Sequence, residues 1–96
     1  MNHRIVRLSS GEEVLCDLVV TGDSYILREP AIIIPAGDGN IGLAHWLPYA
    51  QNDAVTVSKK FVVFVIEPVP QLDSNYNAMM SPIVVPPVKE VVNVTA

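Results

Sequence analysis

The chain has 96 residues, of which half are hydrophobic and only 17% are charged, and its formal net charge is −4. This length supports one domain, and a single domain of this size buries only about 60–65% of the surface that its unfolded chain exposes. The apolar content exceeds what a lone domain covers easily, so it favours a homo-oligomer.

The sequence argues against a nucleic-acid-binding, secreted, membrane-spanning or disulfide-bonded protein. The basic residues are scattered along the sequence, which disfavours general binding to a nucleic-acid backbone, and we expect no DNA partner. The polar N-terminus lacks the apolar stretch of a signal peptide, and the longest apolar run, residues 61–66, is too short to span a bilayer. We therefore expect a cytoplasmic protein that binds no membrane. The single cysteine, Cys16, excludes an intrachain disulfide and is typical of a small buried hydrophobe.

Residues 5–34 have the pattern of three strands joined by two tight turns. In the first turn, Gly11 supplies the positive φ that a tight hairpin needs. The alternating apolar residues are Val6 and Leu8 in strand 4–9, and Val14, Cys16, Leu18 and Val20 in strand 13–20. This period of two predicts strands that turn one face toward a core.

The third strand begins at Tyr25 and meets Pro30 before the apolar run 31–34. Proline cannot donate a hydrogen bond to a neighbouring strand, so it is found at edges and bulges. We expect one long strand that bends near Glu29 and Pro30 and pairs with different neighbours in its two halves, as small barrels require.

Three more strands and a helix are expected in the second half of the chain. The strands are 41–49, which carries Trp46, then 54–58 and 61–66. The last of them is apolar on both faces, which indicates a central strand or one covered by a second layer. Pro70 and the apolar spacing after it predict a short helix over 70–80.

Residues 81–96 combine prolines with valines and isoleucine and hold only two charged residues. This composition predicts an extended segment that lies along a surface or adds to a sheet edge of another subunit. A frayed terminus is the alternative.

No set of residues has the spacing of a catalytic or metal site. His3, Cys16 and His45 are far apart in the sequence, which argues against zinc. Ser9 and Ser10 have no histidine near them in sequence that could activate them as nucleophiles. We therefore expect a protein that is not an enzyme and that has no metal and no cofactor.

The sequence LSSG at 8–11, followed by Val14, Leu18 and Asp23, resembles the first half of an Sm-like (LSm) domain. More closely, the chain is similar to small uncharacterised Sm-like proteins of tailed marine and cyanobacterial bacteriophages. The blocks that carry this similarity are SGEE (10–13), IPAGDGNIGL (34–43), WLPY (46–49), VVFVIEP (62–68) and YNA (76–78).

The resemblance implies an all-β fold: a small, strongly bent five-stranded barrel over residues 1–68, a short helix over 69–80 packed on the barrel or a neighbour, and an extended tail over 81–96. It also implies a ring of roughly five to seven identical subunits whose edge strands pair head to tail. The residues that we expect at this subunit interface are Phe61, Val63, Val65 and Trp46. On this interpretation the protein is a phage-encoded structural or protein-interaction module of the host bacterial cytoplasm.

An RNA-binding ring with a non-standard base site is the alternative function. Its candidate residues are Tyr25, Trp46 and Tyr49 for base stacking, and Arg7 and Arg28 for phosphate contacts. The family's uridine site is not matched residue by residue. Ile26 and Leu27 stand near the Met-Asn of the RNA-binding members, and no Arg-Gly-Asp or Arg-Gly-Asn triplet occurs at 64–67.

Overall fold

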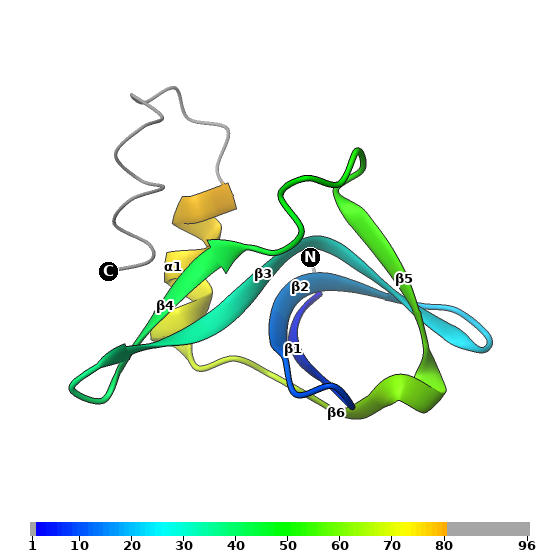
Figure 1. Ribbon diagram of the computed structural model, residues 1–96, viewed down its shortest axis with the longest axis horizontal. Helices are drawn as coiled ribbons and strands as arrows, with labels where there is room; N and C mark the ends of the chain where they lie inside the picture. The colour runs from blue at the N-terminus through cyan, green and yellow to red at the C-terminus, as the bar shows by residue number, and fades with distance from the viewer. Residues whose placement is uncertain (1, 81–96) are drawn as a thin grey trace.

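Figure 1 shows the computed structural model, which describes residues 2–80. This part of the chain is 56% strand and forms one antiparallel sheet of six strands with one short α-helix, which confirms the expected fold class. The strands are β1 (His3–Leu8), β2 (Glu13–Val20), β3 (Ser24–Gly37), β4 (Asn40–His45), β5 (Ala54–Ser58) and β6 (Val62–Ile66). A 3-10 turn, η1 (Lys59–Phe61), joins β5 to β6, and the helix α1 (Pro70–Met80) follows as the sequence predicts. The expected tail, 81–96, lies outside the described residues.

The sheet is strongly bent but not closed, and it has the six strands that the sequence pattern predicts, where the resemblance implied five. The strands follow the order β4-β3-β2-β1-β6, with β5 also paired to β3. The long strand β3 therefore has two partners on one side: residues 24–28 pair with β5 and residues 31–37 pair with β4. The expectation that its two halves meet different neighbours is confirmed.

The bend of β3 lies where Pro30 predicts it. The residue before the proline, Glu29, has a φ of +48°, which breaks the regular strand geometry. On the neighbouring strand β2, the register shifts between Leu15 and Asp17, so that two residues of β3 face the single residue Cys16. An extra residue on one strand is a β-bulge, and a bulge bends the strand that carries it.

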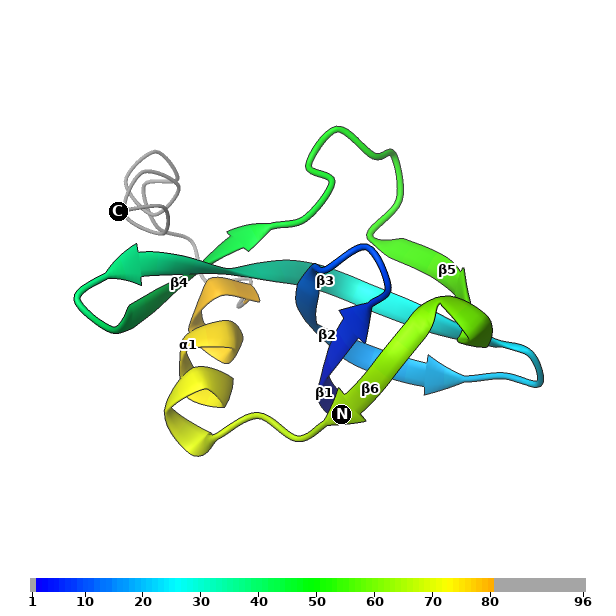
Figure 2. The ribbon, with the colours of Figure 1, turned by 60° about the horizontal axis from the view of Figure 1, so that its bottom comes forward.

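Two hydrophobic clusters lie on opposite faces of the sheet, because neighbouring residues of β1 and β2 belong to different clusters and successive side chains of a strand point to opposite faces. The inner cluster fills the curl of the sheet; its buried residues are Val6, Leu8, Val14, Cys16, Leu18 and Leu27. The outer cluster lies between the sheet and α1; its buried residues are Ile5, Leu15, Ala31, Leu43, Leu72 and Tyr76. Figures 1 and 2 show α1 packed along the two-stranded extension of the sheet that β4 forms with residues 31–37 of β3.

Three details of the strands differ from expectation. Strand β2 is buried on both faces rather than one, because α1 covers the face that carries Leu15. Val20, expected to face the core, is 57% exposed at the end of β2. Strand β4 ends at His45 rather than at residue 49: the N–H of Trp46 still donates to the carbonyl of Pro30, but Leu47 takes a φ of +55°, which is not a strand conformation.

Candidate functional site

The outer strands of the bent sheet leave backbone edges open. Within residues 2–80, β5 pairs only with β3, β6 pairs only with β1, and β4 pairs only with β3. An open edge presents a row of unpaired N–H and C=O groups to which another strand can add. Figure 1 shows β5 and β6 meeting at η1, where the curl of the sheet remains open.

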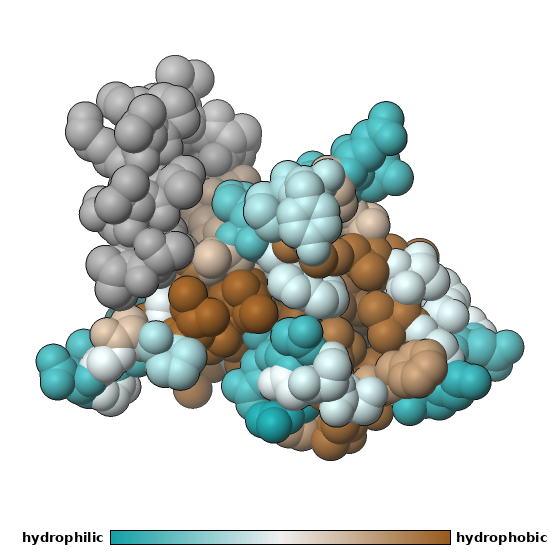
Figure 3. All heavy atoms as spheres, viewed as in Figure 1, coloured by the Kyte–Doolittle hydropathy of each residue, from teal (hydrophilic) through white to brown (hydrophobic). Residues whose placement is uncertain are grey.

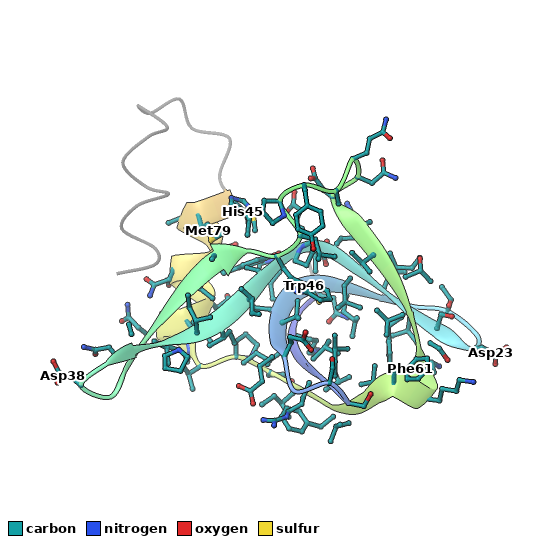
Figure 4. All side chains as sticks on the ribbon, viewed as in Figure 1. Asp23, Asp38, His45, Trp46, Phe61 and Met79 are labelled. Carbon is teal, nitrogen blue, oxygen red and sulfur yellow. The ribbon has the colours of Figure 1, made fainter. Side chains whose placement is uncertain are left out.

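Strand β6 is apolar throughout but lies at an edge, so the expectation of a central strand is wrong for the single chain. Phe61 is 51% exposed, Val63 is 62% exposed and Ile66 is 47% exposed. Val63 is the extra residue where the register between β1 and β6 shifts. In Figure 3 hydrophobic side chains reach the surface over the curl, and Figure 4 places Phe61 at η1.

The structure divides the four residues expected at a subunit interface into two pairs. Phe61 and Val63 are exposed at η1 and β6, as an interface requires. Val65 and Trp46 pack against the inner cluster instead. Two further apolar residues are exposed here, Ile66 at the end of β6 and Val69 shortly after it. Residues 61–66 are apolar on both faces of the strand, and this pattern in the sequence is the signal that could have placed Ile66 at the expected interface as well.

The arginines proposed for RNA binding are both close to carboxylates. Arg7 Nη1 lies 2.9 Å from Glu13 Oε2, and Arg28 Nη1 lies 3.7 Å from Asp17 Oδ2. Each carboxylate offsets the positive charge that a phosphate contact needs.

The aromatic candidates lie in different settings. Tyr25 pairs with Val20 at one end of β2, whereas Arg7 pairs with Glu13 at the other end. Tyr25 also lies beneath Lys59, whose Nζ is 5.4 Å from the ring centroid. Tyr49 is 83% exposed in the loop after β4. The structure thus spreads these residues along the sheet, and RNA binding stays a prediction.

Cys16 and Tyr76 are titratable residues of the hydrophobic core. Burial raises the pKa of the Cys16 thiol to about 12, so the thiol stays protonated and unreactive at neutral pH. Burial also raises the pKa of the Tyr76 hydroxyl, which donates a hydrogen bond to the backbone carbonyl of Glu29. Over the part of the chain that the structure describes, no three His, Cys, Asp or Glu side chains gather as metal ligands would. In the same residues, no helix has the length and apolar character needed to cross a membrane.

A pocket of about 400 Å³ lies between the bend of β3, the end of β4, the loop 46–53 and the last residues of α1. Its apolar wall includes Trp46, Pro48 and Met79, and Glu29 and Asp53 add carboxylates. Figure 4 shows His45, at the end of β4, close to Met79. No local pattern in the sequence indicates this pocket, because its residues are spread from position 29 to position 80.

No family model matches the chain, and no curated protein matches it.

Proposed function

We propose that this chain is a self-associating structural module whose subunits join through the open edges of β5 and β6. The observation that carries the proposal is the composition of β6. A strand that is apolar on both faces is typical of the centre of a sheet, yet this strand is an edge. A β5 strand from a second subunit, paired to β6, gives it the neighbour that its sequence indicates.

The chemistry of the edge supports this function. Natural edge strands carry lysine, proline or inward-pointing charges, which prevent unwanted pairing with another strand. Strand β6, VVFVI, has none of these, and its bulge at Val63 is the one irregularity. Burying Phe61, Val63 and Ile66 against a neighbour removes apolar surface from water, at about 25 cal/mol per Å².

The geometry of the edges determines the kind of assembly. The edges of β5 and β6 are different surfaces, so a contact between them is head to tail and leaves one open edge on each end of a dimer. Such contacts form a closed ring when the rotation between subunits closes, and an open filament when it does not. The resemblance to Sm-like domains favours a ring of roughly five to seven subunits and a phage-encoded structural role.

The test is the mass of the protein in solution. We expect light scattering after size-exclusion chromatography, at micromolar concentration, to give roughly five to seven times the monomer mass of 10.4 kDa. Val63→Lys places a charge on the β6 edge, and we expect this variant to elute as a smaller species.

The matched control is Val20→Lys, because Val20 is 57% exposed but lies at the end of β2, away from the edges of β5 and β6. We expect this variant to keep the wild-type mass. A wild-type protein that is monomeric at micromolar concentration would end the proposal, as would equal loss of mass in both variants.

A further inference from the structure

We propose that the pocket beside Trp46 binds a lysine or arginine side chain carried by an extended segment of a partner protein, whose backbone adds to the open edge of β4. This inference concerns a different surface from the β6 edge.

The pocket is preformed by hydrogen bonds between distant parts of the chain. The N–H of Glu29 donates to the carbonyl of Asp53 across 2.6 Å, and the N–H of Trp46 donates to the carbonyl of Pro30 across 3.0 Å. From the helix, the Tyr76 hydroxyl donates to the carbonyl of Glu29 at 2.7 Å. A framework fixed in this way loses little entropy when it binds a ligand.

The backbone around the pocket is strained. Three non-glycine residues in the described part of the chain have positive φ, and two of them, Glu29 at +48° and Leu47 at +55°, line this pocket. The left-handed conformation is unfavourable for residues with a side chain, above all for a bulky residue such as leucine. Strained residues are common at binding sites, where the surrounding structure holds them in place.

The charge of the pocket selects a cation. Glu29 and Asp53 line it, and none of the lining residues is lysine or arginine. Within residues 2–80, no basic group lies within ion-pair distance of either carboxylate, since the observed pairs use other acids. His45 is the remaining titratable group that lines the pocket.

The apolar wall selects the stem of the side chain. Trp46, Pro48 and Met79 offer apolar surface next to the carboxylates. Lysine and arginine have this dual character, because an apolar stem carries a charged head. The indole of Trp46 is also the aromatic ring that attracts a cation most strongly.

The open edge of β4 indicates that the side chain belongs to a peptide. Strand β4 ends at His45, which lines the pocket, and in the described chain its far edge has no partner. An extended peptide that pairs with such an edge gains backbone hydrogen bonds, while alternate side chains enter neighbouring pockets. One basic side chain of that peptide then reaches Glu29 and Asp53.

The test uses the fluorescence of Trp46, which is the single tryptophan of the chain. The probe is the acetylated and amidated pentapeptide Thr-Val-Lys-Val-Thr, added to the full-length protein at low salt. We expect a saturable change in emission. Peptides with norleucine or glutamate in place of lysine keep the strand character and remove or reverse the charge, and we expect each to bind more weakly. N-acetyl-lysine amide, which cannot add a strand, should bind at least about tenfold more weakly than the peptide.

On the protein, Asp53→Asn should weaken binding of the lysine peptide roughly two- to fivefold, the range for an exposed charge pair, and should leave the norleucine peptide unaffected. Glu12→Gln is the matched control, because Glu12 lies in the turn after β1 and does not line the pocket, and its change should alter the binding of neither peptide.

Three results would overturn the proposal. The first is no emission change with the lysine peptide. The second is equal affinity for the lysine and norleucine peptides. The third is binding of the lysine peptide by the Lys89→Ala variant but not by the wild-type protein. That result would mean that Lys89 of the chain itself is the ligand of the pocket. Light scattering on the same samples separates these outcomes from a failure of self-association.

Discussion

The hydroxyl of Tyr76 donates a hydrogen bond of 2.7 Å to the backbone carbonyl of Glu29, 47 residues earlier in the chain. This bond joins the middle of α1 to the bend of β3, where the backbone leaves the regular strand conformation. The helix therefore does more than cover one face of the sheet, since it also holds the bend that lets β3 pair with both β4 and β5.

Removing this hydroxyl should destabilise the fold. Tyr76→Phe keeps the ring but removes the donor to the carbonyl of Glu29 in a part-buried hydrogen bond, and we expect the free energy of unfolding to fall by about 1–2 kcal/mol. Urea denaturation followed by circular dichroism measures the loss. The control is Tyr49→Phe, because Tyr49 is 83% exposed, and it should change stability little. Equal effects of the two changes would contradict a special role for Tyr76.

The hairpin turn after β1 should require glycine. Gly11 has a φ of +109°, and a side chain there is strained even though no atom lies near the position of a Cβ. We expect Gly11→Ala to cost about 1–2 kcal/mol in the free energy of unfolding. Gly22 lies in the other early turn, has no positive φ and has equally open space, so Gly22→Ala should be neutral or slightly stabilising. Thermal unfolding of both variants checks this, and the prediction is wrong if the two behave alike.

Stability should fall at alkaline pH. The pKa of Cys16 is raised from 9.0 to about 12 by burial, and burial raises the pKa of Tyr76 above its ordinary 10.0. A raised folded-state pKa means that the folded protein holds its proton after the unfolded chain has lost it, so stability is complete below pH 9 and declines as the pH rises toward 12. Between pH 8 and pH 11 we expect Cys16 to contribute a loss of roughly 2 kcal/mol.

The measurement is a series of urea denaturation curves over that range of pH. Cys16→Ala removes the thiol, so its stability should decline less steeply with pH than that of the wild type. An identical slope in both proteins would show that Cys16 does not contribute to the decline.

The contact between His3 and Asp73 should hold α1 against β1. His3 Nδ1 lies 2.6 Å from Asp73 Oδ1, the His3 side chain is only 11% exposed, and its ring packs edge-on against Tyr76 at 4.9 Å between centroids. We expect His3→Ala to speed hydrogen exchange in α1 at least about fivefold, which corresponds to roughly 1 kcal/mol of local stability.

Strand β2 should keep its slow exchange in this variant if the effect is local to the helix. The control is Gln71→Ala, because Gln71 makes only an exposed side-chain hydrogen bond of 3.4 Å to Asn75 within α1. Faster exchange in both variants would indicate general fraying of the helix rather than loss of the contact with His3.

Local features of this protein follow from its sequence, because they depend on residues close together in the chain. The alternation of apolar residues predicts β2, and its inner face, with Cys16 and Leu18, is buried as expected. Gly11 has the positive φ that its turn needs, Pro30 lies at the bend of β3, and α1 spans Pro70–Met80. Each of these depends on backbone preferences within a few residues.

Only the tertiary structure decides which surfaces meet. Leu15 is buried because α1 packs on a face of β2 that the alternation leaves to solvent. Within residues 2–80, β6 is an edge strand although its apolar pattern predicts a central one, because the pairing of strands depends on the whole path of the chain. The pocket beside Trp46 joins residues that are up to 51 positions apart, from Glu29 to Met80. Such contacts arise from the burial of apolar surface across the fold, which alternation and turn residues do not encode.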